Sequence, residues 1–378
     1  MPRSLWLTLF FIVLLTPFVL RWAIGSAARP SGARDELRLV IITPHAESIR
    51  TEFADAFSAW HRQKYGQGVL VDYRIYGGAT DIVRYFDNGR GTLFKELGTF
   101  QVDLAWGGGD DLFDRRLKRP GYLEGVKLGD DTMRRAFEQQ AISGLPLYDL
   151  ASDPPQWFGT ALSSFGIVYN KDVLHYLELP EPTTWTDLAD PRYRGWLVLA
   201  DPTRSGVAKT SFMVIVERAM QDAIDAGQSP DAGWARGMGL IRQIAANARN
   251  FTDGSTGVSG IVGAGEAGAG MAIDFHARSQ VDAVQVGNTS RLGYVEPRGA
   301  TAINPDPIAL VKGAEHRDVA IRFIEYILSE PGQRLWNTRA GAPGGPRTTS
   351  LRRLPIRKSV YDDPRDFTDP VNPYVAAS

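Results

Sequence analysis

The sequence contains no cysteine among its 378 residues. It can therefore form no disulfide and no thiolate metal site, and it offers neither a cysteine nucleophile nor a lipidated N-terminal cysteine. It also lacks an excess of either charge, because 42 basic residues face 43 acidic ones and leave a net charge of -1. Such a balance exerts no general attraction on a phosphate backbone, so nucleic acid is not an expected partner.

Long apolar runs are scarce, and the only one stands near the N-terminus. A short basic start precedes the uncharged run Leu5–Leu20, and the small residues Gly25–Ala28 follow. This order predicts a secretory signal peptide over residues 1–28, cleaved after Ala27 or Ala28. The run is close to the ~20 residues of a spanning helix, so an uncleaved signal anchor is the alternative. In both cases the rest of the chain is expected in the periplasm or another extracytoplasmic compartment.

The signatures of common enzymes are missing as well. There is no G-x-S-x-G element for a serine nucleophile, and the five histidines are too dispersed for local metal-ligand spacing. Gly263, Gly265 and Gly268 match the dinucleotide-binding pattern, but the apolar strand-like run follows these glycines instead of preceding them. We therefore expect neither an enzyme nor a bound cofactor. An exported hydrolase is the alternative from the enzyme class.

A repeated order of apolar strand, glycine-rich turn and helix is present. Leu37–Thr43 is a β-branched run typical of a buried parallel strand. Thr43 is the expected N-cap of the helix that follows, with Pro44 at its first position. Val69–Tyr76 and Val102–Trp106 are further predicted strands, each followed by glycines. This order predicts a doubly wound α/β lobe.

A second unit of the same kind follows the proline-rich connection Ser152–Gln156. Phe165–Tyr169, Gly195–Leu199 and Gly270–Phe275 are its predicted strands. The predicted division of the chain is a first part of lobe 1 (36–155), a first part of lobe 2 (156–275), a return to lobe 1 (276–330), and a C-terminal segment packed on lobe 2 with a loosely packed tail (331–378).

Four predicted strand ends carry small or polar residues where a helix opens: Thr43–His45, Gly77–Thr80, Gly107–Asp110 and Thr203–Gly206. Ligands of open α/β sheets bind at the carboxyl ends of strands, where the first turns of helices present free N–H groups. Two lobes with such ends can face each other. The pattern thus favours a two-lobed receptor that closes on a small, negatively charged solute.

Several segments, in this order, resemble the extracellular solute-binding proteins of ABC importers, close to the ferric-iron-binding branch. They run from about Leu37 to Trp336 and read LVIITPHAESIRTEFADAF, VDLAWGGG, GIVYNKDVL, PTTWTDLADPRYRGWLVLADPTRSG, GEAGAGMAIDF and INPDPIALVKGAEHRDVAIRFIEYILSEPGQRLW. The resemblance implies a bilobal periplasmic-binding-protein fold of type II, with two crossings between lobes joined by a hinge. It also implies closure on the solute and delivery to a membrane permease. We expect a monomer.

The resemblance also bears on the choice of solute. Iron-binding members carry a histidine after the first strand, where His45 stands here, and two adjacent tyrosines where this sequence has Asp274 and Phe275, followed by His276. Without the two phenolates the usual ferric site is incomplete. An aspartate can instead accept hydrogen bonds from hydroxyl or amine groups. Related branches bind phosphorylated sugars or other organophosphorus compounds, so a small anionic organic solute, such as a phosphate ester or phosphonate, is expected.

We expect the anionic group at the helix openings Gly78–Thr80 and Thr203–Gly206, with added charge from Arg204 or Lys209. The polar end is expected near Asp274 and His45. The predicted ligand-binding residues are His45, Gly78, Ala79, Thr80, Trp106, Asp110, Ser164, Thr203, Ser205, Gly206, Asp274 and Phe275, with Ser163 and Phe165 near the crossing between lobes. The alternative is a ferric or other metal ion, held by His45 and Asp274 together with Glu96 or Asp110.

Overall fold

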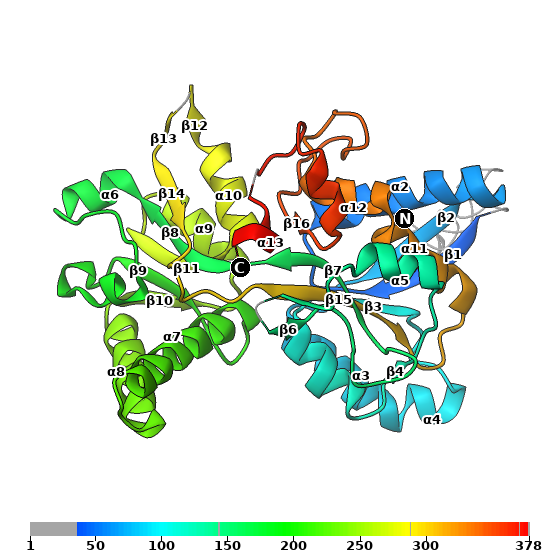
Figure 1. The fold of residues 1–378 in the computed structure, drawn as a ribbon, viewed down its shortest axis with the longest axis horizontal. Coiled ribbons are helices and arrows are strands. Elements are labelled where there is room, and N and C mark those ends of the chain that lie inside the picture. The colour runs from blue at the N-terminus through cyan, green and yellow to red at the C-terminus, as the bar shows by residue number, and fades with distance from the viewer. Residues whose placement is uncertain (1–35, 143, 288, 370, 377–378) are drawn as a thin grey trace, which may run out of the picture.

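The computed structural model describes residues 36–142, 144–287, 289–369 and 371–376. Figure 1 shows two α/β lobes side by side, each with helices on both faces of a central sheet. The predicted fold class is therefore confirmed. Within the described residues no helix is both long enough and apolar enough to cross a membrane. The predicted signal peptide or anchor over residues 1–28 lies outside the described residues.

The larger lobe is built on a seven-stranded sheet of order β16-β7-β15-β3-β1-β2, with β4 paired to β15. Its strands are β1 (Leu37–Ile42), β2 (Val69–Arg74), β3 (Leu104–Trp106), β4 (Leu123–Glu124), β7 (Phe158–Ser163), β15 (Asn304–Val311) and β16 (Leu354–Pro355). Strand β1 is parallel to β2 and β3, as its buried β-branched run predicts, whereas β15 runs antiparallel to β3 and β7.

The smaller lobe is built on a five-stranded sheet of order β10-β9-β11-β8-β14. Its strands are β8 (Phe165–Asn170), β9 (Leu197–Ala200), β10 (Ala248–Thr252), β11 (Ala269–Ile273) and β14 (Leu292–Val295). The long helices α7 (Gly206–Asp225) and α8 (Pro230–Ala246) lie on one side of this sheet. On the other side lie α9 (Thr256–Gly263) and α10 (Asp274–Ala283). The short α6 (Lys171–Tyr176) follows β8, and its buried Leu174 packs in the same apolar cluster as α7 and α8.

Two apolar clusters hold the larger lobe together, one on each face of its sheet. Helix α2 (Glu47–Tyr65) buries Phe53 and Phe57 in the first, beside α11 (Arg317–Leu328) and α12 (Glu330–Asn337). Helix α3 (Ala79–Gly91) buries Phe86 in the second, beside the π-helix η1 (Leu112–Lys118). The smaller helices of this lobe are α4 (Leu93–Leu97) and α5 (Asp130–Ala136).

The start of α2 differs from the prediction. Its N-cap is Ala46, without a side-chain hydrogen bond, and Thr43 caps nothing. Thr43 instead continues the hydrogen bonding between β1 and β2, because its N–H donates to the carbonyl of Arg74 at 3.1 Å. Its hydroxyl accepts from the His45 N–H at 3.1 Å instead. The link from Thr43 to Ala46 thus stays outside the helix, and His45 lies against Trp106 and the loop at Gly107.

The chain passes between the two sheets at points other than those expected. Strand β7 ends in the larger sheet at Ser163 and β8 begins in the smaller one at Phe165. The return lies between Val295, where β14 ends, and Asn304, where β15 begins. The expected limits at residues 155 and 275 thus differ from the sheet pairing. The proline-rich connection near Pro155 is a turn within the larger lobe, where its carbonyl accepts from the Val126 N–H at 2.9 Å.

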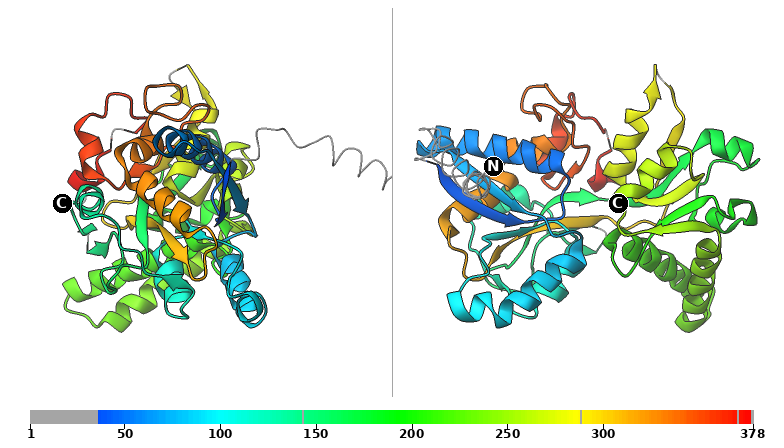
Figure 2. Two further views of the ribbon diagram at one scale, coloured as in Figure 1. Left: turned by 90° about the vertical axis from the view of Figure 1, so that its right-hand side faces the viewer. Right: turned by 180° about the vertical axis from the view of Figure 1, so that it is seen from behind.

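The C-terminal segment also differs from the expectation of a loose tail on lobe 2. Strand β16 pairs with β7 of the larger sheet, and Leu351, Leu354 and Ile356 are buried in that lobe's core. The last elements, η4 (Lys358–Asp362) and α13 (Pro373–Ala376), follow it. Figure 2 shows this segment, drawn orange to red, between the larger lobe and α10. Two ion pairs, Arg352 with Asp282 and Asp369 with Arg278, join it to α10.

Candidate functional site

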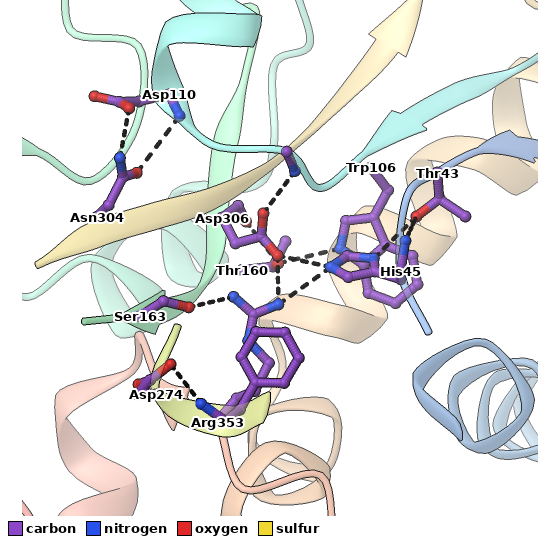
Figure 3. Close-up of polar contacts among 12 residues, drawn as sticks. Thr43, His45, Trp106, Asp110, Thr160, Ser163, Asp274, Asn304, Asp306 and Arg353 are labelled. Atoms are coloured by element: carbon purple, nitrogen blue, oxygen red, sulfur yellow. Dashed lines mark hydrogen bonds and ion pairs between the residues drawn. The ribbon is translucent and has the colours of Figure 1, made fainter. Parts of the chain in front are cut away.

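A buried polar network lies where both crossing strands meet the C-terminal segment. Asp306, on β15, accepts from His45 Nε2 at 2.6 Å and from the Gly108 N–H at 2.9 Å. Arg353 forms an ion pair with Asp306 and donates through Nη2 to Ser163 Oγ at 2.6 Å (Figure 3). Its side chain is only 2% exposed. Burial alone would raise the pKa of Asp306, but the Arg353 charge and the His45 contact lower it below its usual value.

His45 sits within this network and has protein partners at both ring nitrogens. Its Nδ1 lies 3.0 Å from Thr43 Oγ1, and its ring meets Trp106 edge-on with centroids 4.4 Å apart. Burial lowers the pKa of His45, although the Asp306 charge works in the opposite direction. Nε2 lies 2.6 Å from the Asp306 carboxylate and 3.1 Å from Arg353 Nη1, so both ring nitrogens are occupied by protein groups. In this arrangement His45 positions Asp306 and leaves no ring nitrogen for a ligand.

Gly107 is the position that lets the strand-end loop pass over His45. Its φ is +88°, and a Cβ there would lie 2.6 Å from His45 Cε1. Gly107→Ala is therefore expected to lose about 1–2 kcal/mol from left-handed backbone strain and about 1–3 kcal/mol more from displacement of the ring. Urea unfolding of both proteins measures this loss.

The matched control is Gly121→Ala, at φ +82° with no atom within 4 Å of the added Cβ. Gly121→Ala should lose only the stability that left-handed backbone strain costs. Equal losses in the two variants would contradict the contact with His45.

The first turn of α10 brings two buried, unpartnered polar atoms to the boundary between the lobes. Asp274 is fully buried; its Oδ1 accepts from the Phe275 N–H at 2.8 Å, and its Oδ2 has no hydrogen-bond partner. His276 Nδ1 is likewise buried and unpartnered. Burial raises the pKa of Asp274 to about 6, against the charges of Arg278 and Arg353, and lowers the pKa of His276 to about 4. Two such atoms can accept or donate hydrogen bonds to a polar ligand.

Phe275, between these two residues, packs its ring on the larger lobe's arginine. The Arg353 guanidinium carbon lies 4.6 Å from the ring centroid. A cation over an aromatic face is attracted by the ring's quadrupole. The first turn of α10 is thus held against the C-terminal segment. The N–H of Asp274 also donates to the carbonyl of Ser164, at 3.0 Å.

The predicted helix openings come together across the two lobes. Thr80 Oγ1, in the first turn of α3, lies 3.4 Å from the carbonyl of Thr203, which precedes α7. A Cβ built on Gly78 would lie 3.3 Å from the carbonyl of Arg204, and one on Gly206 would lie 4.0 Å from the carbonyl of Gly108. Gly78, Ala79, Thr80, Thr203 and Gly206 are partly or fully exposed, whereas Ser205 is buried and caps α7 through its hydroxyl.

Three predicted site residues have other partners in the structure. Trp106, one of the predicted ligand-binding residues, is fully buried in the core, and its Nε1 donates to the Thr160 hydroxyl at 3.1 Å. Asp110 accepts from Asn304 Nδ2 at 2.7 Å. Ser164 donates to Glu296 at 2.6 Å, beside the crossing between the sheets.

The metal set considered as an alternative is not assembled. Glu96 is exposed on α4, while His45 and Asp110 have the protein partners described above. Across the part of the chain that the structure describes, no three His, Cys, Asp or Glu side chains come together as a group that could hold a metal ion.

Sequence reasoning missed Asp306, Asn304 and Arg353. A carboxylate inside the apolar stretch of β15 was a usable signal for Asp306, because a buried charge needs a partner. Arg353 carried no such signal, since it stands among other charged residues of a segment read as a tail.

Comparisons with known proteins agree on the family. Residues 109–361 match the family model described as bacterial extracellular solute-binding protein. A phosphoglycerate transport regulatory protein of Salmonella typhimurium is 30% identical over 175 residues, which are 46% of this chain and 39% of that protein. The chain therefore spans less than half the length of that curated relative.

Two solved structures show the same fold at low identity. The periplasmic binding protein AfuA from Actinobacillus pleuropneumoniae, with exogenous fructose-6-phosphate bound, superposes with a TM-score of 0.65 at 18% identity, covering 85% of this chain and 86% of that one. Iron-bound HitA from Pseudomonas aeruginosa gives a TM-score of 0.61 at 15% identity, covering 90% and 92%. With the family model matching most of its length, the chain belongs to the family of bacterial extracellular solute-binding proteins.

Proposed function

We propose that this protein captures a small anionic organic solute between its lobes and delivers it to the permease of an ABC-type importer. The observation that carries the proposal is the meeting of helix N-termini from opposite lobes. Thr80, in the first turn of α3, lies 3.4 Å from the carbonyl of Thr203, which stands two residues before the N-cap of α7. Both helices exceed twelve residues, and their unpaired first N–H groups and dipoles favour a negative charge between them.

The other end of the solute is expected at the first turn of α10. Asp274 Oδ2 and His276 Nδ1 are buried without partners, which is costly unless a ligand group bonds to them. Hydroxyl groups can satisfy both atoms, because a hydroxyl donates and accepts. The proposed solute thus combines an anionic group with hydroxyls, as in a phosphorylated sugar or sugar acid. A relative named for phosphoglycerate transport and a structural neighbour with bound fructose-6-phosphate support this class.

The remaining parts of the proposal follow from the family. Its members are extracellular binding proteins, so we propose a periplasmic location, a membrane permease as partner, action as a monomer and no chemistry on the solute. A ferric solute is less well supported, because the described residues bring no metal-binding group together.

A thermal-shift panel on residues 29–378 tests the solute class. It contains fructose 6-phosphate, 3-phosphoglycerate, a phosphonate, inorganic phosphate, sulfate, ferric citrate and unphosphorylated fructose. A bound compound at about a thousand times its dissociation constant should stabilise the protein by ~4 kcal/mol and clearly raise its melting temperature. A shift with phosphate esters alone is the expected result. A shift with ferric citrate alone, or with fructose and fructose 6-phosphate equally, would contradict the proposal.

Gly206→Asp tests where the anionic group binds. A carboxylate in the first turn of α7 favours the helix itself but repels an anion at the same N–H groups, so affinity for the stabilising phosphate ester should fall at least about tenfold. The control is Gly206→Asn, which has nearly the same shape and no charge. Calorimetry of both variants provides the measurement, and equal affinities would place the anionic group elsewhere.

A further inference from the structure

One contact between the lobes joins opposite charges. Lys209 Nζ, in the first turn of α7 in the smaller lobe, lies 2.5 Å from Asp111 Oδ2, which directly precedes η1 in the larger lobe. The contact between Thr80 and Thr203 joins the same two lobes. The Lys209 ammonium is therefore paired with a carboxylate across the lobe boundary, where the sequence suggested that it would add charge for the solute.

We propose that Lys209 and Asp111 form an electrostatic latch, a positioning pair that favours the closed arrangement of the lobes. The latch rests on the closure of the lobes in the proposed function. It goes beyond that function, because two residues that need not touch the solute then raise the affinity for it. A pair that exists only when the lobes meet adds its free energy to the closed state alone. By linkage it slows solute release and leaves the contacts of the solute unchanged.

The expected size of this bias is modest. Both side chains are partly exposed, at 48% for Lys209 and 40% for Asp111, and exposed ion pairs contribute little and weaken in salt. Asp111 also has Arg115 at 3.6 Å within its own lobe, so it keeps a cationic neighbour when the lobes separate. An exposed ion pair of this kind is expected to raise the ratio of closed to open molecules by about 1.5- to 5-fold.

The absence of cysteine makes the experiment direct. Lys95→Cys on α4 and Ala235→Cys on α8 introduce two exposed label sites, one on each lobe, in a chain without other thiols. Figure 1 shows that these helices lie on the same side of the molecule but in different lobes. Single-molecule energy transfer between the labels, with no solute added, then gives the populations at short and long distance in the otherwise complete exported chain.

Lys209→Met and Asp111→Asn are each expected to lower the closed-to-open ratio by about the same 1.5- to 5-fold. The double variant should fall no further, and the exchanged pair Lys209→Asp with Asp111→Lys should recover part of the loss. High salt should lower the ratio in the parent and leave both single variants nearly unchanged. The matched control is Arg218→Met, which removes an ion pair with Asp222 of similar exposure that lies wholly within α7. It should keep the parent's ratio.

Several outcomes would overturn the latch. These are a parent without a short-distance population, single variants with the parent's distribution, or a loss in Lys209→Met without one in Asp111→Asn. The last result would mean that Lys209 favours the closed arrangement through a group other than Asp111. Because no solute is present, failure of the latch is independent of the thermal-shift panel. A phosphate ester that shifts the melting temperature in that panel supports the proposed function even if the latch fails.

Discussion

Replacing Arg353 with methionine is expected to lower the free energy of unfolding by about 3–5 kcal/mol. The guanidinium is almost fully buried between Asp306 and Ser163, and methionine fills much of its volume without its charge. The loss arises mainly because the Asp306 carboxylate stays buried after its cation is gone. Urea unfolding at pH 7 measures the change. The loss should shrink below about pH 4, where Asp306 ionises in neither the unfolded state nor the variant.

Arg357→Met is the matched control, because Arg357 is also buried in this segment but donates through Nε to the neighbouring Ser359 hydroxyl, at 2.9 Å. It should lose about 1.5–3 kcal/mol or less. Arg353→Met combined with Asp306→Asn should lose less than the sum of the two single variants, because neither partner is then left charged and alone. If Arg353→Met were no more costly than Arg357→Met, the network would not be the stabilising element that its geometry indicates.

The second large effect concerns the two buried groups at the start of α10, whose pH dependences have opposite signs. The pKa of Asp274 is raised from 3.8 to about 6, so this residue makes folding less favourable as the pH rises from 4 to 6. The pKa of His276 is lowered from 6.5 to about 4, so this residue makes folding more favourable over nearly the same range. Each residue changes the free energy of unfolding by about 3 kcal/mol over this pH range. In the parent the two contributions largely cancel.

Single variants should reveal each contribution separately. Relative to the parent, Asp274→Asn should gain about 3 kcal/mol in free energy of unfolding between pH 4 and pH 7, and His276→Asn should lose about 3 kcal/mol over the same interval. Urea unfolding across this range gives both differences. Asp231→Asn, which makes the same carboxylate-to-amide change at an exposed position in the first turn of α8, is the control for the substitution itself. Two differences of the same sign, or two flat ones, would contradict the burial that the structure shows.

The larger features of the fold could be predicted from the sequence because they depend on local patterns. The β-branched run at Leu37 became β1, and the apolar periodicity after Asp318 became α11. Pairing between distant segments could not be predicted in this way. The short β16 has two residues, too few for any periodicity, and joins the larger sheet only because β7 offers it an edge.

In the candidate site, too, the local features could be predicted from the sequence and the distant contacts could not. Glycines and hydroxyls after strands predicted the openings at Gly78 and Thr203, since backbone geometry demands such residues locally. The partners that decide what each side chain does come from far along the chain. Asp306 reaches His45 across 261 residues, and Arg353 reaches it across 308. Those distant partners turn His45 from an expected ligand contact into a buried support.

The order of strands in the two sheets has a consequence for how the exported chain folds. All strands of the smaller sheet lie between Phe165 and Val295, so this lobe can form from one continuous stretch. The larger sheet needs β1 from the beginning, β15 from beyond the smaller lobe, and β16 near the end. Its contacts span long loops, which are slow to close. As the chain is completed from its N- to its C-terminus, the lobe begun first is therefore expected to finish last, leaving the apolar faces of β1 and α2 exposed until α11 and α12 (residues 317–337) arrive.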